Sequence, residues 1–504
     1  MRWIESRKVQ ATLLGAICLL AASSNEARAQ APSESWDALF IGNNKVGYIR
    51  TSVEPVKDNE NNRSLVRVRV DYNLTVRRGA DSVSMDVQYG TIETPDGEVL
   101  RLDTRTHASN QVIRVHGDVI DGKMTLKIEN GNQTQQEVIP WAADVKGPYG
   151  PELSFSRSPM KPGEVRKLKT FVPDLNKIVE ATLAARSLEQ IPLGGGAVRE
   201  LLKVEQTAVT LDNKPMPEMT QTFWVDAVGQ VLKTFNDTYG GTTSYRTTKE
   251  AATRNVNKID QFDLIGGLVV KAARKISNPE NSRDIVYKVT MTDSDPSAFF
   301  PVDRRQTIKA GPDPKTVTMT VKTAGPDAGT AGPETVGDEF TRSNPLVTSA
   351  DSQVIRLARK AVEGQTDPWL KAQAITKWVA ANIKSKNFET SFAPADEVAR
   401  TLQGDCTEHG VLTAAMCRAE GIPARVVVGL VYASHLGGFG YHMWNEVYVN
   451  RRWVAVDSAF DQNQVDAVHI KLSETSLDGV SPFETFSSVA RVATKLKLEA
   501  LEVR

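Results

Sequence analysis

The sequence predicts a multidomain protein: an all-β N-terminal region with a curved antiparallel sheet, then a small β module, then an α+β C-terminal domain. Three observations lead to this prediction. The chain has 504 residues, whereas single hydrophobic cores stop growing near ~250 to 300 residues. Polar and apolar residues alternate with a period of two in the first half of the chain. Beyond residue 350 the apolar residues instead recur with helical spacing.

The first 29 residues have the parts of a secretory signal peptide. Arg2, Arg7 and Lys8 precede an apolar run over 11–22, and a small-x-small pattern ends at Ala29. A membrane anchor would need about 20 apolar residues to cross a bilayer, and this run is shorter. We therefore expect cleavage after Ala29, a secreted or periplasmic protein, and no transmembrane span after signal removal.

Composition and charge exclude several function classes. Lysine and arginine number 61, as do aspartate and glutamate, so the formal net charge is zero. Without a basic excess, no nucleic-acid partner is expected. The sequence also lacks the signatures of serine hydrolases, P-loop proteins, dinucleotide-binding folds and HExxH metalloproteases. No cofactor is therefore implied.

Residues 30–255 are predicted to form the β-rich N-terminal domain. From Val66 to Val76 every second residue is apolar, which is the signature of a half-buried strand. A strand of this length is typical of a curved sheet. A weak similarity between 96–103 and 228–235, each preceded by a strand-like run, favours two similar halves within this region.

The composition changes in residues 256–345, for which a small β module is predicted. Residues 283–292 and 315–323 have the β-branched and aromatic content of strands. Between these strands and the next domain, residues 324–337 are rich in glycine, proline and small side chains. We expect this segment to be a flexible loop.

The last predicted domain covers residues 346–504 and begins with helices. Asp367 and Pro368 have the preferences of an N-cap and a first helical position, and an apolar face follows as far as Ile383. A shorter helix over 394–403 is expected to end at Gly404.

A third helix is expected to start at once, with Asp405 as its N-cap and Gly421 at its end. An apolar stripe along 411–419 supports it. The chain then becomes β-like, with strands predicted over 424–432, 442–449 and 453–457.

Two cysteines remain after signal removal, Cys406 and Cys417. If 405–420 form one helix, a rise of ~1.5 Å per residue puts their α-carbons about 16 Å apart, beyond the ~7 Å limit for a disulfide. Both are therefore expected to be free thiols. Cys406 lies in the first helical turn, where unpaired N–H groups and the helix dipole favour a thiolate and could bind an oxyanion. Cys417 is expected in the core.

A nucleophilic cysteine needs a base, and the chain has six histidines. His409 follows Cys406 by three residues, close enough for contact, but nothing in the sequence orients its ring. His442 begins a predicted strand and is the stronger candidate. The other four are expected to be ordinary surface or loop residues: His107, His116, His435 and His469.

The predicted hairpin over 442–457 places an acid beside His442. If Asn450 and Arg451 form a two-residue loop, Trp444 lies opposite Asp457, and His442 lies two residues further along the same face. An odd number of loop residues would put His442 and Asp457 on opposite faces. The other face is apolar, as expected for a core: Met443, Val447, Val449, Val454 and Val456.

Cys406, His442 and Asp457 then form a nucleophile, a base and an orienting acid in that chain order. The segments "GDCTEHGVLTAAMCRAEGIPARVVVGLVY" and "YHMWNEVYVNRRWVAVD" resemble the bacterial transglutaminase-like superfamily, over about 350–475. The resemblance implies a papain-like fold for the C-terminal domain and a catalytic triad at these three positions. The family hairpin usually has alanine at the position of Met443 and proline near that of Ser458. Neither departure changes a triad residue.

The resemblance further implies thiol acyl chemistry on a protein or peptide substrate. Cys406 would attack an amide carbonyl, His442 would protonate the departing amine or ammonia, and an acyl thioester would pass to water or to an amine. Hydrolysis, deamidation and acyl transfer share these steps. The sequence therefore predicts a thiol acyltransferase or a cysteine peptidase or amidase.

Two alternatives remain open. Cys406 and His409 form a C-x-x-H half-site, with Cys417 or His442 as further metal ligands, but no second closely spaced pair completes a zinc site. A non-catalytic transglutaminase-fold protein could instead bind a partner or act as a scaffold of the cell envelope. The presence of all three triad residues favours the enzyme.

Overall fold

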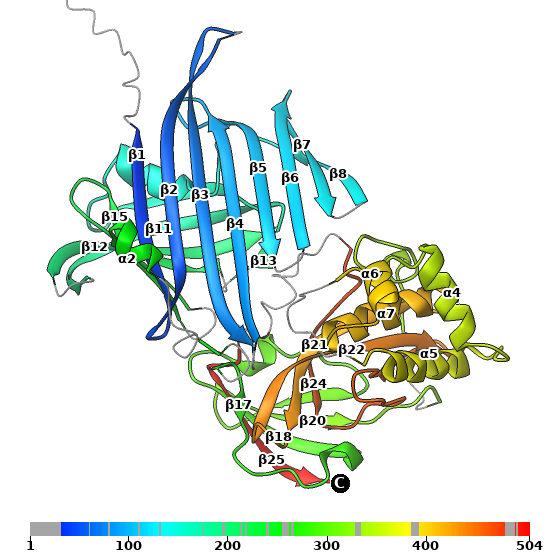
Figure 1. Ribbon diagram of the computed structural model, residues 1–504. Coiled ribbons are helices and arrows are strands. Elements are labelled where there is room, and N and C mark those ends of the chain that lie inside the picture. The colour runs from blue at the N-terminus through cyan, green and yellow to red at the C-terminus, as the bar shows by residue number, and fades with distance from the viewer. Residues whose placement is uncertain are drawn as a thin grey trace, which may run out of the picture.

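The computed structural model describes residues 32–504 apart from 60, 79–80, 109–110, 131–132, 174, 194–196, 212–213, 217–218, 238–240, 255–261, 264–266, 328–333, 385–392, 479–488 and 490–491. The predicted signal peptide and its cleavage after Ala29 lie outside the described residues. A large sheet occupies the N-terminal half of the chain, and helices and two smaller sheets occupy the C-terminal half (Figure 1). No helix among the described residues is long and apolar enough to cross a membrane.

The N-terminal region forms one large sheet in the order β8-β7-β6-β5-β4-β3-β2-β1-β16-β15-β14-β12-β11-β10-β9, with β13 paired to β12. All pairings are antiparallel except that of β9 with β10. The strands are β1 (Ser33–Ile41), β2 (Asn44–Asp58), β3 (Arg63–Arg78), β4 (Asp81–Glu93), β5 (Val99–Ala108), β6 (Gln111–Ile120), β7 (Lys123–Asn130), β8 (Gln133–Pro140), β9 (Val145–Lys146), β10 (Val165–Val172), β11 (Lys177–Pro192), β12 (Val198–Leu211), β13 (Lys214–Pro215), β14 (Gln221–Val225), β15 (Val231–Asn236) and β16 (Thr242–Thr247).

The sheet curves so that its two halves face each other across helix α1 (Gly150–Arg157). Leu153 of α1 packs on Val53 and Val66 of β2 and β3. Phe155 packs on the other half, with its ring 5.3 Å from that of Phe223. The prediction of a curved antiparallel sheet is confirmed. The similarity of its two halves stays a prediction, although 96–103 and 228–235 each lead into the second strand of a hairpin.

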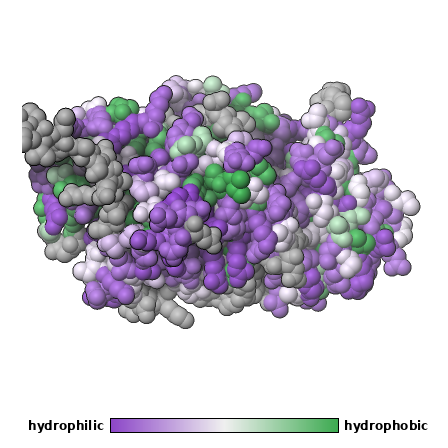
Figure 2. Space-filling view, turned by 90° about the horizontal axis from the view of Figure 1, so that it is seen from above, coloured by the Kyte–Doolittle hydropathy of each residue, from purple (hydrophilic) through white to green (hydrophobic). Residues whose placement is uncertain are grey.

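The period-two alternation has the expected effect on strand β3. Val66, Val68, Val70 and Val76 are buried, while polar residues alternate with them on the other face. Figure 2 views the molecule from above: hydrophilic residues cover most of this face, and hydrophobic residues form small groups. Short helix α2 (Lys249–Thr253) follows β16 at the edge of this region.

Partly buried Glu152 in α1 should make stability depend on pH. One of its carboxylate oxygens has no hydrogen-bond partner among the described residues, and burial, with the nearby charge of Asp37, raises its pKa to about 7. Between pH 4.5 and 7 the folded state keeps a proton that the unfolded state has released, so the free energy of unfolding falls as the pH rises. At pH 8, Glu152→Gln should therefore be more stable than the wild type by about 2 to 4 kcal/mol.

Urea unfolding of both proteins at pH 4.5, 6 and 8 checks this prediction. The stability difference should disappear at pH 4.5. Glu54→Gln, at an exposed position of β2, serves as the control and should follow the wild type. Parallel stability curves for Glu152→Gln and wild type would contradict the assignment.

The small β module forms a four-stranded sheet with the chain's last strand, in the order β19-β20-β18-β25. Its strands are β18 (Asp284–Met291), β19 (Gln306–Ala310), β20 (Thr316–Lys322) and β25 (Leu496–Val503). Short 3₁₀ helices lie at η3 (Pro279–Asn281), η4 (Pro296–Ala298) and η5 (Asp338–Phe340). Both predicted strands are present. The described part of the loop over 324–337 contains no helix or strand, and its predicted flexibility stays a prediction.

The C-terminal domain packs four helices against a second sheet, β17-β22-β21-β24, with β23 paired to β22. The helices are α4 (Ser352–Ala361), α5 (Pro368–Asn382), α6 (Ala395–Thr401) and α7 (Cys406–Ala419). The strands are β17 (Val270–Lys271), β21 (Ala424–Ala433), β22 (Gly438–Val449), β23 (Arg452–Val456) and β24 (His469–Thr475). Its core is continuous with that of the β module: Tyr287 and Met319 belong to the same buried cluster as Val411. The domain boundaries after residues 255 and 345 stay predictions.

One predicted helix end is wrong. Helix α6 ends at Thr401 rather than at Gly404, because Leu402 already adopts a left-handed conformation with φ of 51°. Gly404 has a different role. Its φ is 143°, and a Cβ at this position would lie 2.3 Å from Cβ of Glu408. Glycine is therefore required for the close approach of the chain to the start of α7.

Candidate active site

Cys406 is the first residue of helix α7, as predicted. Asp405 caps the helix: its carboxylate accepts a hydrogen bond from the Thr407 N–H at 2.8 Å. The Glu408 carboxyl group in turn accepts one from the Asp405 N–H at 3.0 Å, which completes a capping box. Cys406 is partly exposed. The thiol thus lies at the positive end of the helix dipole, where an anion is favoured.

The hairpin carrying the predicted base has the expected register. Val449 pairs with Arg452, and the pairing continues to Asn445 with Val456. The two loop residues, Asn450 and Arg451, have φ of 50° and 63°, as a type I′ turn requires. The register prediction is confirmed, and all five residues predicted for the apolar face are buried.

His442 and Asp457 therefore meet on one face of the hairpin. Nε2 of His442 lies 2.7 Å from Oδ2 of Asp457, and both side chains are buried. Burial disfavours the Asp457 charge, but the charges and hydrogen bonds of His442 and His469 hold its pKa well below the usual value. An ionised carboxylate can only accept, so Nε2 of His442 carries the proton. Nδ1 is then the nitrogen of His442 that can act on a thiol.

Comparison with known proteins decides the family of this region. Residues 355–458 match the model of the transglutaminase-like superfamily. Residues 355–458 form a transglutaminase-like domain. The resemblance recognised in the sequence motifs is thus confirmed for this part of the chain.

Two curated relatives and two solved structures are similar to the chain. Kyphoscoliosis peptidase of Homo sapiens and that of Mus musculus are each 28% identical over 120 residues, covering 20% of this chain and 17% of the relative. The chain thus spans about a sixth of the length of these relatives. A candidate cysteine protease from Cytophaga hutchinsonii is 17% identical, covering 43% of this chain and 83% of that chain with a TM-score of 0.28. A candidate protease from Parabacteroides distasonis is 12% identical, covering 74% and 69% with a TM-score of 0.18.

The second cysteine of the transglutaminase-like domain lies in its core. Cys417 is completely buried within α7, and burial raises its pKa to about 12. Neither Cys417 nor Cys406 forms a disulfide, as expected from their separation along the helix. Cys417 is therefore a structural residue.

His409 is held by its own helix. Its Nδ1 lies 2.6 Å from the backbone oxygen of Asp405; because a carbonyl oxygen only accepts, Nδ1 donates. Burial lowers the pKa of His409, so the ring stays neutral. The backbone oxygen of His409 accepts a hydrogen bond from Ser458, just after Asp457. His409 therefore links the start of α7 to the end of the triad hairpin.

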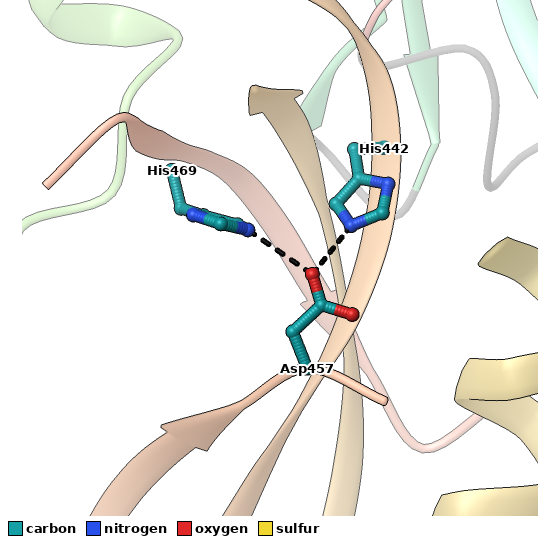
Figure 3. Close-up of side chains that lie close together, drawn as sticks. All are labelled: His442, Asp457 and His469. Atoms are coloured by element: carbon teal, nitrogen blue, oxygen red, sulfur yellow. Dashed lines mark hydrogen bonds and ion pairs between the residues drawn. The ribbon is translucent and has the colours of Figure 1, made fainter. Parts of the chain in front are cut away.

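Among the described residues, Cys406 and His409 are not part of a complete metal site. In the part of the chain that the structure describes, the one group of three close metal-type ligands consists of His442, Asp457 and His469. Within this group His442 and His469 are each hydrogen-bonded to Asp457 (Figure 3), which accounts for the proximity of the three side chains.

The prediction for His469 is wrong. It is completely buried at the start of β24, and its Nε2 lies 3.1 Å from the same oxygen of Asp457 that His442 contacts. Its Nδ1 lies 2.7 Å from Asp466. A signal was present in the sequence, because His469 begins an apolar strand, as His442 does, and follows an aspartate by three residues.

Two aromatic residues cover His442, and sequence reasoning missed one of them. The ring of Phe460 stacks on His442 at 4.6 Å and 16°, although Phe460 is 47% exposed. Trp444 is stacked at 6.2 Å and also packs in a small core with Val427 and Ala455. Trp444 thus both shields His442 and packs in a core.

Phe460→Ala should lower the rate of Cys406 alkylation by about two- to tenfold, because an aromatic stack contributes about 0.5 to 1.5 kcal/mol and its loss lets His442 move. Iodoacetamide labelling followed by mass spectrometry measures the rate. Leu370→Ala, which removes an equally exposed side chain from α5, is the control. An unchanged rate in Phe460→Ala would show that the stack does not hold the base.

Proposed function

We propose that this protein is a secreted or periplasmic cysteine enzyme that acts on amide bonds of proteins or peptides through an acyl thioester. Cys406 is the nucleophile, His442 the base and Asp457 the orienting acid. The observation that carries the proposal is the buried His442–Asp457 pair, in a transglutaminase-like domain whose helix α7 begins with a cysteine. The proposed location rests on the signal-peptide pattern of residues 1–29.

The first half-reaction forms the thioester. Cys406 gives its thiol proton to Nδ1 of His442, the thiolate sulfur adds to the amide carbonyl carbon, and the Cys406 backbone N–H at the start of α7 stabilises the resulting oxyanion. His442 donates its Nδ1 proton to the amide nitrogen, the C–N bond breaks, and an amine or ammonia leaves. The Asp457 carboxylate keeps the ring in the orientation that presents Nδ1, and it stabilises the imidazolium.

The second half-reaction releases the acyl group. Water or an amine attacks the thioester carbon and gives a proton to His442, the C–S bond breaks, and Cys406 is regenerated. Water gives hydrolysis or, from a glutamine side chain, deamidation; an amine gives a cross-link. The acceptor that reaches the thioester therefore decides the product.

Comparing products of wild type and Cys406→Ser identifies the reaction. A mixture of cell-envelope proteins is incubated with each, and the peptides are analysed by mass spectrometry. We expect one class of change, namely deamidation, isopeptide formation or backbone cleavage, in the wild-type sample only. The serine variant keeps the size of the side chain but is a far weaker nucleophile. Identical peptide sets would favour the alternative of a non-catalytic binding protein.

A further inference from the structure

The triad acid has a second imidazole partner that the proposed reaction does not use directly. Oδ2 of Asp457 accepts from His442 at 2.7 Å and from His469 at 3.1 Å. The two rings reach this oxygen from different strands, β22 and β24 (Figure 3). Their centroids are 5.6 Å apart. Asp457 is therefore held from two sides.

His469 is itself held between two carboxylates. Its Nδ1 lies 2.7 Å from Asp466 and its Nε2 lies 3.1 Å from Asp457. Carboxylates only accept, so both ring nitrogens must carry protons and the ring is an imidazolium. Burial alone would disfavour this charge, but the hydrogen bonds to Asp457 and Asp466 raise the pKa of His469.

Asp466, the other carboxylate that contacts His469, is itself held by hydrogen bonds. Asp466 accepts from the side-chain amide of Gln462 at 2.7 Å and from the Val468 N–H at 3.1 Å. Gln462 pairs through its backbone with Asp457, in both directions at 2.7 and 2.8 Å. Residues 457–469 thus form a closed loop of hydrogen bonds around the triad acid.

We propose that His469 is a positioning residue. As an imidazolium between Asp466 and Asp457, it holds the Asp457 carboxylate in place and offsets part of the effect that the Asp457 charge has on His442. This inference rests on the proposed function, because it assigns His469 a role in the same site. It explains why a completely buried histidine lies at the triad with both nitrogens occupied by acids.

The charged and titratable groups around the pair can be named from each element. From β22 His442 faces Asp457, from α7 the neutral ring of His409 lies within electrostatic range of Asp457 and His442, and from the loop before β24 Asp466 faces His469. Phe460 and Trp444 contribute apolar rings to the same cluster. His469 is the cation nearest to His442 in this set.

His469→Gln tests the inference, because glutamine can still donate to Asp457 but carries no charge. Without the cation 5.6 Å away, the His442 imidazolium should be favoured and should lose its proton about one pH unit higher. In the plot of Cys406 alkylation rate against pH, the alkaline limb should move to higher pH by the same amount. Iodoacetamide rates between pH 5 and 10 give the profile, and His435→Gln, at an exposed loop position, is the matched control.

A purely structural role predicts something different, namely lower thermal stability with an unchanged profile. That outcome in folded His469→Gln would overturn the proposal. If the variant does not fold, the wild-type protein decides: in histidine labelled with ¹⁵N, both nitrogens of His469 should be protonated at pH 7. A neutral His469 ring would equally overturn the proposal.

These tests separate the two proposals. If His442→Ala alkylates as fast as wild type, the proposed function fails whatever His469 does. The ¹⁵N signal of His442 in His469→Gln still shows whether its deprotonation moves to higher pH. If the His442 signal shifts but His442→Ala does not change the reactivity of Cys406, His469 does act electrostatically on His442, and the proposed function alone fails.

Discussion

His442→Ala is expected to slow the alkylation of Cys406 by iodoacetamide at pH 7 by about ten- to a hundredfold. The imidazolium of His442 stabilises the thiolate, and without it only a few per cent of an ordinary cysteine is ionised at this pH. The hairpin should stay intact, because its register depends on the turn at Asn450 and on the buried valines of the opposite face. Mass spectrometry of the labelled peptide gives the rate.

Two controls make this result specific. Cys406→Ser shows the labelling that does not come from Cys406, which should be small because Cys417 is buried. His435→Ala removes an exposed histidine from the same domain and should leave the rate unchanged. A rate in His442→Ala equal to that of the wild type would exclude His442 as the base.

Lys471→Met should lower the free energy of unfolding by about 3 to 5 kcal/mol. Lys471 is 2% exposed, and its ammonium group lies 2.6 Å from Asp303 and 2.7 Å from Glu446. Asp303 comes from the β module and Glu446 from the triad hairpin, so Lys471 joins the two parts. Methionine fills a similar volume but leaves buried Glu446 and partly buried Asp303 without this cation.

Urea unfolding followed by tryptophan fluorescence measures this loss of stability. Lys309→Met, at an exposed position of β19, is the control and should change stability by no more than about 0.5 kcal/mol. Equal unfolding midpoints for Lys471→Met and wild type would show that the buried ion pairs contribute no net stability.

Local features of the site were predictable from the sequence. The α7 cap depends on Asp405 and Glu408 within one turn. The His442–Asp457 contact depends on a two-residue turn and a strict alternation, both of which lie within 442–457. In such a hairpin, the face on which a side chain lies follows from the number of residues between it and the turn.

Contacts that depend on distant pairing were not predictable, although the place of His469 at the start of an apolar strand was a signal. His469 reaches Asp457 because β24 pairs with β21, where Val431 lies opposite His469. Nothing within a single segment specifies that pairing. Likewise, no periodicity indicates that β25 completes the sheet of the β module. The end of α6 was missed for a different, local reason: Gly404 accommodates the side chain of Glu408 rather than ending the helix.

The central claim is that Cys406 is a thiolate nucleophile supported by His442. Its most direct test is the ultraviolet absorbance of the thiolate, measured between pH 4 and 10 as the difference between wild type and Cys406→Ser. The account predicts that most of the thiolate absorbance is already present at pH 7 and that His442→Ala removes it. Thiolate that appears only near pH 8.5, as in an ordinary cysteine, and equally in both proteins, would contradict the account.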